Sequence, residues 1–125
     1  MGIDIYAKWL NQTKVEEDKQ YCGFNAWNGY SGYLREAYHG EPYATHFFVK
    51  EAFESQEAQA RIPAKVLKER LPETIKLVRE REQGVYQETD EYSIWKTQKS
   101  FVDFYKLCKR KEKENGEACI ISASY

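Results

Sequence analysis

Apolar and polar residues alternate at both ends of the chain. In GIDIYAKWL (residues 2–10), the residues that face one way are Ile3, Ile5, Ala7 and Trp9. In CIISASY (119–125), the matching set is Cys119, Ile121, Ala123 and Tyr125. A period of two is typical of a strand with one buried face. We therefore predict a strand at each end of the chain, the second with Tyr125 turned inward.

Two long stretches in the second half repeat apolar residues every three or four positions, as amphipathic helices do. The first carries the stripe Ile62, Val66, Leu67 and Leu71, and Ile75 and Val78 extend it toward Gly84. Pro72 removes a backbone donor, so we expect 62–71 and 73–83 to differ in direction or to be separated by a turn. The second helix opens at the acidic stretch 88–91 and stops at Asn115-Gly116. Its inner face is Ile94, Phe101, Tyr105 and Cys108.

The first half of the chain has shorter patterns. Thr13 is placed to cap a short peripheral helix over 14–21, and the Gly- and Asn-rich segment 23–32 is typical of a loop. Leu34, Ala37 and Tyr38 recur at helical spacing before Gly40, which predicts two turns of helix over 32–39. Pro42 bars a return to helix, and the alternating segment 43–50 then predicts a strand.

These elements predict one α+β domain over residues 1–125. Three strands separated by helices favour a small, mostly antiparallel or mixed sheet, covered on one face by the two long helices. A length of 125 residues suits a single core and leaves no room for a second domain.

Composition narrows the partners and the compartment. A formal net charge of −1 argues against nucleic acid or an anionic membrane as a partner, and no apolar run approaches the length of a membrane span. The chain shows no secretion signal, and its cysteines are odd in number and widely spaced. We therefore expect a cytoplasmic protein with reduced thiols, and Cys22 stays open as a reactive one because it lies in a predicted loop.

The richest candidate for chemistry is GYSGYLREAYHGEPYAT (29–45), which holds four of the ten tyrosines. If 32–39 is helical, Arg35, Glu36 and His39 project outward together. A guanidinium binds carboxylate or phosphate, an imidazole exchanges a proton near neutral pH, and tyrosine rings stack. The predicted ligand-binding residues are Tyr30, Tyr33, Arg35, Glu36, His39 and Tyr43. The same residues also suit a packed loop with a solvated ion pair.

Other chemistry has weaker support in the sequence. His39 and His46 have no zinc-ligand spacing, and no nucleophile motif or phosphate-binding glycine loop is present. We therefore expect neither a metal nor a cofactor. The basic run 106–113 is interrupted by Glu112 and lacks interleaved aromatics, so a solvated helix end explains it better than a nucleic-acid site.

Three functions stay open. The first is a non-enzymatic binding module that uses residues 30–46 to hold a small anionic ligand or a protein partner. The second is a small cytosolic enzyme with His39 as general acid or base. The third is a structural subunit that forms a homodimer through aromatic residues such as Trp9, Trp27 or Tyr125.

The chain also resembles a known family in most of its length. The residues that carry the resemblance are GIDIYAKW, GYLREAYHGEPYAT, RLPETIKL and FYKLCKRKEKENGEACIISASY. They are similar to a family of small uncharacterised bacterial proteins of unknown function, some of them phage-borne. The resemblance implies one intact domain and supplies no activity, substrate, cofactor or site residue.

Overall fold

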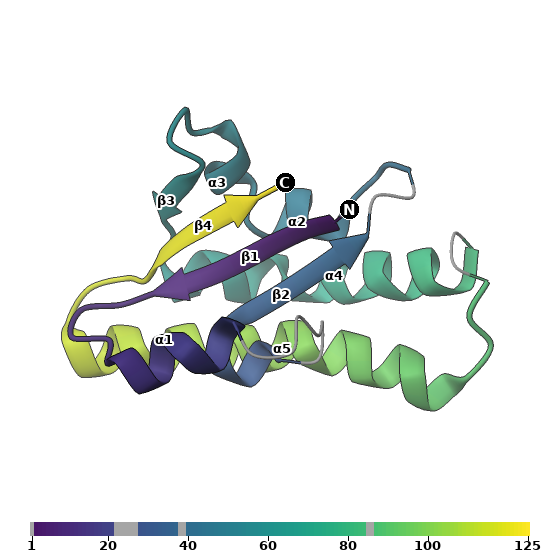
Figure 1. The fold of residues 1–125 in the computed structure, drawn as a ribbon. Helices are drawn as coiled ribbons and strands as arrows, with labels where there is room; N and C mark the ends of the chain where they lie inside the picture. Colours follow the sequence, from purple (N-terminus) through teal and green to yellow (C-terminus); the bar gives the residue numbers. More distant parts are fainter. Residues whose placement is uncertain (1, 22–27, 38–39, 85–86) are drawn as a thin grey trace.

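The computed structural model describes residues 2–21, 28–37, 40–84 and 87–125, which form an α+β fold (Figure 1). The strands are β1 (Gly2–Lys8), β2 (Tyr33–Ala37), β3 (Gln59–Arg61) and β4 (Ile120–Ser124). The helices are α1 (Lys14–Tyr21), the 3-10 turn η1 (Gly29–Ser31), α2 (Ala44–Phe48), α3 (Lys50–Glu54), α4 (Ala64–Gly84) and α5 (Glu91–Asn115). No helix in this part of the chain combines the length and the apolar character that a membrane span needs.

The four strands form one antiparallel sheet in the order β2-β1-β4-β3. The two ends of the sequence meet at its centre, where Ala7 lies opposite Ile121 and Ile5 lies opposite Ala123. These four side chains are buried on the face against which α4 and α5 lie side by side (Figure 1). Phe101 and Phe104 of α5 close the core from the helix side. Alternation at the two termini thus builds the middle of the sheet.

Several predictions from the sequence are confirmed. Strands occupy both ends of the chain, and α4 and α5 lie where the helical periodicity placed them. In α1, the Thr13 hydroxyl accepts a hydrogen bond from the Glu16 amide, and Glu16 accepts one from the Thr13 amide. This reciprocal pair is a capping box. At the end of α5, Gly116 adopts the left-handed conformation that stops the helix.

The helix predicted over 32–39 is wrong for its described part, because residues 33–37 form β2. Leu34 and Glu36 are buried toward the helices, whereas Tyr33 and Arg35 belong to the other face of the sheet. The i, i+3 spacing of Leu34 and Ala37 is too short a signal to distinguish a helix from a strand. Residues 33–37 form a strand because β1, a distant segment of the chain, supplies their backbone hydrogen-bond partners.

The strand predicted over 43–50 is also wrong, because this segment forms α2 and the start of α3. The Glu36 carboxylate accepts hydrogen bonds from the Ala44 and Thr45 amides, both at 2.9 Å, and from the Thr45 hydroxyl at 2.6 Å. The first amides of a helix need such acceptors. Since the acceptor comes from another element, no local signal marks the helix start.

Three smaller corrections follow. The sheet has four strands rather than three, because β3, which lies between α3 and α4 where no strand was predicted, pairs with β4. Pro72 lies inside α4, which continues on both sides of it, so the predicted turn is wrong, while the alternative of a change in helix direction stays a prediction. Tyr125 follows the end of β4 and is 59% exposed rather than turned inward.

Candidate functional site

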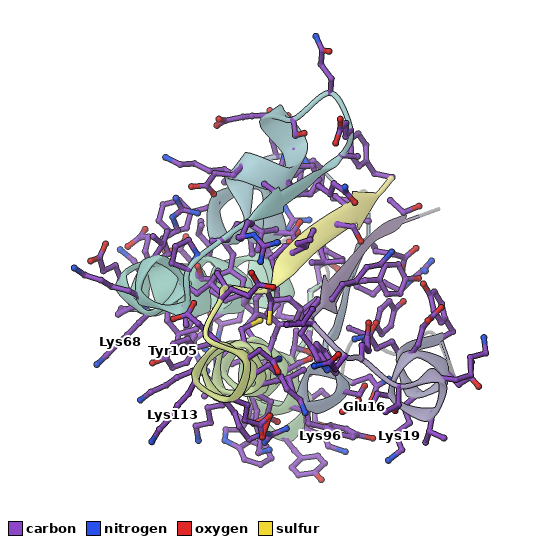
Figure 2. All side chains as sticks on the ribbon, turned by 90° about the vertical axis from the view of Figure 1, so that its left-hand side faces the viewer. Glu16, Lys19, Lys68, Lys96, Tyr105 and Lys113 are labelled. Carbon is purple, nitrogen blue, oxygen red and sulfur yellow. The ribbon has the colours of Figure 1, made fainter. Side chains whose placement is uncertain are left out.

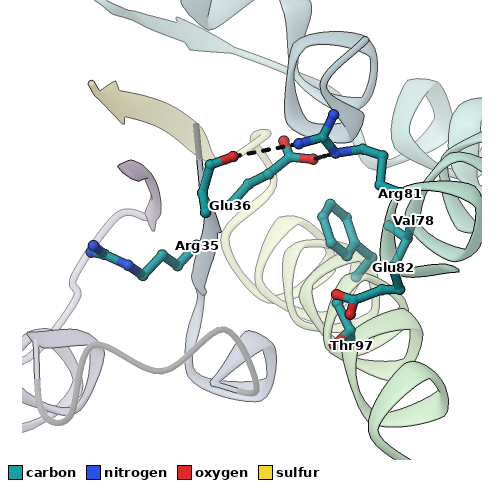
Figure 3. Close-up of a pocket in the computed structure, with 8 residues that line it drawn as sticks. Arg35, Glu36, Val78, Arg81, Glu82 and Thr97 are labelled. Atoms are coloured by element: carbon teal, nitrogen blue, oxygen red, sulfur yellow. Dashed lines mark hydrogen bonds and ion pairs between the residues drawn. The ribbon is translucent and has the colours of Figure 1, made fainter. Parts of the chain in front are cut away.

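A cavity of about 250 Å³ lies between β2, α4 and α5 (Figure 3). Its walls come from the end of β2 and from facing positions of the two long helices. The lining residues are Arg35, Glu36, Ala37, Val78, Arg81, Glu82, Thr97 and Phe101. Val78 and Phe101 are buried and supply apolar walls, while the Glu36–Arg81 pair lies at one edge of the cavity and Glu82 with Thr97 at another (Figure 3). This combination is typical of small-molecule sites.

Glu36 and Arg81 form a buried ion pair at the edge of the cavity. The Glu36 carboxylate lies 2.9 Å from the Arg81 Nε, and only 8% and 4% of their side chains are exposed. The Arg81 guanidinium donates to the carbonyl oxygens of Gly40 and Pro42 and lies 4.7 Å from the centre of the Tyr43 ring. Both charges therefore hold residues 40–45 against α4.

Arg35 is engaged on the opposite side of β2. Its side chain points away from the cavity (Figure 3), and its Nη1 donates to Asp4 at 2.9 Å. The Tyr33 hydroxyl donates to the same Asp4 oxygen at 2.6 Å. Burial, followed by the hydrogen bond to Asp4, raises the pKa of Tyr33. The Arg35 charge is thus compensated outside the cavity.

Glu82 is the charged side chain that faces the cavity without an ion-pair partner among the described residues. It projects beside Thr97 (Figure 3). Burial raises the pKa of the Glu82 carboxyl group, and the charges of Glu88 and Glu36 raise it further. A hydrogen bond with Thr97 and the charge of Arg81 act in the opposite direction. A partly buried carboxylate in this setting attracts a cation or a hydrogen-bond donor.

The structure divides the six residues that the sequence put forward. Arg35 and Glu36 lie at the cavity but on opposite faces of β2, and Tyr43 contacts Arg81. Tyr33 is buried next to Asp4, while Tyr30 lies in η1 and is 65% exposed. His39 lies outside the described residues, as does Cys22, so the proposals for these two side chains stay predictions.

Sequence reasoning missed Arg81 and Glu82, which lie in the charged run VREREQ (78–83) and look solvated there. A usable signal was present: Thr74, Val78 and Arg81 follow each other at helical spacing, and all three are buried. An arginine on the buried face of a helix is almost always paired with an acidic group, because an unpaired buried charge is unfavourable. The identity of that partner, Glu36, depends on the sheet.

The described residues contain no group of three His, Cys, Asp or Glu side chains that could hold a metal ion. A scan against protein-family models, a search of curated proteins and a search of solved structures each found no match to this chain. The resemblance to a bacterial family therefore stays a prediction from the sequence.

Proposed function

We propose that this protein is a non-enzymatic binding module that holds a small molecule in the cavity between β2, α4 and α5. The ligand class is an organic cation, or a neutral molecule with a strong hydrogen-bond donor, attached to an apolar body. The observation that supports this proposal is the position of Glu82, whose carboxyl group faces the cavity next to the apolar Val78 and Phe101.

Charge accounts for the sign of the ligand. Glu36 and Arg81 neutralise each other, and Asp4 neutralises Arg35, so Glu82 leaves the cavity with one negative charge. A carboxylate that loses hydration on burial regains favourable interaction when an ammonium group binds it. An anion in the same cavity would meet repulsion from Glu82.

The cavity volume limits the ligand to small molecules. About 250 Å³ is below the roughly 300–1,000 Å³ of sites for drug-sized ligands, so one ring with a short charged arm is a suitable size. Benzylamine is therefore a fitting probe, with benzyl alcohol and benzoate as neutral and anionic comparisons. At about 0.5 kcal/mol per non-hydrogen atom, we expect benzylamine to bind with a Kd of about 1 mM.

The experiment is an NMR titration that follows the Val78 and Thr97 methyl groups. Benzylamine should shift both signals and benzoate neither. Glu82→Gln keeps the shape and removes the charge, so it should weaken benzylamine binding by about tenfold or more. Glu80→Gln removes a neighbouring exposed carboxylate from the same helix and should leave the affinity unchanged.

The pH gives a second readout. Because the pKa of Glu82 is raised, its charged form is lost at a higher pH than for an exposed glutamate. Benzylamine affinity should fall as the pH is lowered through that pKa, and in Glu82→Gln this step should be absent. Equal losses in Glu82→Gln and Glu80→Gln, or tighter binding of benzoate at the cavity, would refute the proposal.

A further inference from the structure

A second recess lies between α1, η1 and α5, at the other end of α5 from the cavity. Its described lining comprises Trp9, Glu16, Lys19, Tyr30, Ser31, Leu107 and Arg110. Its volume is about 150 Å³, close to the size of an engineered protein cavity that accepts benzene. Thr97 and Arg110 are thirteen positions apart on α5, a rise of about 20 Å, so the two sites are distinct.

The position of Tyr30 is fixed by close packing of the backbone beneath it. A Cβ atom at Gly29 would lie 1.8 Å from the Ser100 carbonyl oxygen, so only glycine lets η1 approach α5 this closely. The buried Gln20 amide donates to the carbonyl oxygens of Ala7 and Ser31, which ties α1 to β1 and η1. The Tyr30 ring is nevertheless 65% exposed, so it is held in place without being covered.

The acidic side chains around the recess already have partners. Glu16 pairs with Lys111 at 3.1 Å, and that ammonium also pairs with Glu114 at 3.3 Å and lies 5.2 Å from the centre of the Trp9 ring. Asp18, at the outer rim, pairs with Lys14 at 3.2 Å. Figure 2 looks nearly along the axis of α5 and shows Glu16 and Lys19 on α1, to the right of α5.

Lys19 and Arg110 are left with no ion-pair partner among the described side chains. They come from different helices, line the same recess and are both exposed. Beside them stand the rings of Tyr30 and Trp9, above the buried Leu107. Two cations give charge-assisted hydrogen bonds to an anion, and the rings give stacking faces to a flat apolar body.

We infer that the α1–η1–α5 recess binds a small aromatic anion, with Lys19 and Arg110 holding the acidic group and Tyr30 and Trp9 flanking the ring. This inference does not depend on the cavity at Glu82. The ligand class is the anionic one expected from the sequence. The cations that bind it in this inference are Lys19 and Arg110 rather than Arg35.

Phenyl phosphate is the probe, with inorganic phosphate and phenol as comparisons that carry the charge alone and the ring alone. The readout is an NMR titration of the folded chain that follows the Trp9 indole N–H. Phenyl phosphate should bind at least about tenfold more tightly than either comparison, and its affinity should fall as salt is added.

Variants locate the site. Arg110→Gln and Lys19→Gln should each weaken phenyl phosphate binding by about tenfold, since each removes a charge-assisted hydrogen bond. Tyr30→Ala should weaken it by about two- to tenfold through lost stacking. The matched control is Lys109→Gln, which removes an exposed charge from the next position of α5, beside a different set of residues around Pro63. All four positions are exposed, so the variants should fold.

Each outcome bears on the inference. Absence of a Trp9 shift at millimolar phenyl phosphate would overturn it. Equal weakening by Lys109→Gln would mean that a diffuse positive field, rather than a site, attracts the probe, and would overturn it as well. Equal affinity for inorganic phosphate would refute the role of the two rings. Failure of benzylamine at the Glu82 cavity would leave these results unaffected.

Discussion

The Glu36 carboxylate on β2 lies 2.9 Å from the Arg81 Nε on α4, and both side chains are more than nine-tenths buried. Glu36 also accepts three hydrogen bonds from Ala44 and Thr45. Arg81 donates to carbonyl oxygens of Gly40 and Pro42. One ion pair thus joins a strand, a short helix and a long helix, and it forms the rim of the candidate site.

Breaking this pair should destabilise the fold strongly. Arg81→Met leaves Glu36 as a buried charge without its cation, which costs about 3–5 kcal/mol of unfolding free energy in urea denaturation. The control is Arg79→Met on the same helix, which breaks the exposed pair with Glu91 and should cost about 0–1 kcal/mol. The double variant Glu36→Gln/Arg81→Met should lose less than the sum of its single variants. Equal effects of Arg81→Met and Arg79→Met would contradict the structural role.

The pair of Glu51 and Arg70 predicts a dependence of stability on pH. Hydrogen bonds from Arg70 lower the pKa of Glu51 below its ordinary value. A carboxyl group whose folded pKa is lowered stabilises the fold above its unfolded pKa, and the effect is lost as pH falls through the folded value. The Glu51 side chain is 37% exposed, so solvent screening limits the contribution to about 1 kcal/mol. Glu51→Gln should therefore be less stable than the parent at pH 7, and the gap should close in acid. Glu57→Gln, at an exposed position, should show no such gap.

Pro72 should make α4 less stable than its length suggests. It lies at an exposed position inside the helix, where its ring removes the backbone donor to the carbonyl four residues earlier. Pro72→Ala should raise the free energy of unfolding by about 1–3 kcal/mol. The greater conformational entropy of the unfolded chain without the proline offsets part of this gain. Glu73→Ala at the next exposed position should change it little. A loss of stability in Pro72→Ala would mean that α4 needs the proline for its shape.

The C-terminal strand should be essential because β4 lies between β1 and β3. Ile121 is fully buried in this strand, so Ile121→Ala should cost about 2–5 kcal/mol. Tyr125→Ala removes a larger side chain that is 59% exposed and whose ring lies 5.2 Å from that of Phe53, so it should cost less, about 0.5–1.5 kcal/mol. Comparison of the two thermal unfolding curves tests the assignment, and a larger loss in Tyr125→Ala would contradict it.

Cys108 and Cys119 should be unreactive in the folded protein. Both thiols are free and 1% exposed. The neighbouring thiol of Cys119, together with burial, raises the pKa of Cys108 well above its ordinary value. The hydrogen bond between the two thiols lowers the pKa of Cys119, so it is burial that protects Cys119 from the reagent. Iodoacetamide at neutral pH should modify neither residue until denaturant unfolds the chain, as peptide mapping would reveal. Modification of Cys119 in the native protein would indicate that the start of β4 opens.

The sequence by itself determined the elements whose signals are local. Alternation in residues 2–8 and 120–124, the capping box at Thr13 and the glycine stop at Gly116 each act within a few residues, so the pattern and the structure agree. The α+β class and the helix-covered sheet follow from these elements. The apolar stripes of α4 and α5 are long enough to outweigh even Pro72.

Tertiary structure decided the conformation of residues 33–37 and 44–54. Their local patterns are short and fit either a strand or a helix, so the choice depends on partners from elsewhere: β1 pairs with β2, and Glu36 caps α2. The same choice set the chemistry. Adjacent residues point to opposite faces of a strand, so Arg35 turns to Asp4 and Glu36 turns to Arg81, and neither is left for a ligand. The candidate binding charges also depend on packing. Glu82 faces a cavity that forms only where β2, α4 and α5 meet. Lys19 and Arg110 line the same recess only because α1 and α5, which are distant in sequence, pack near each other.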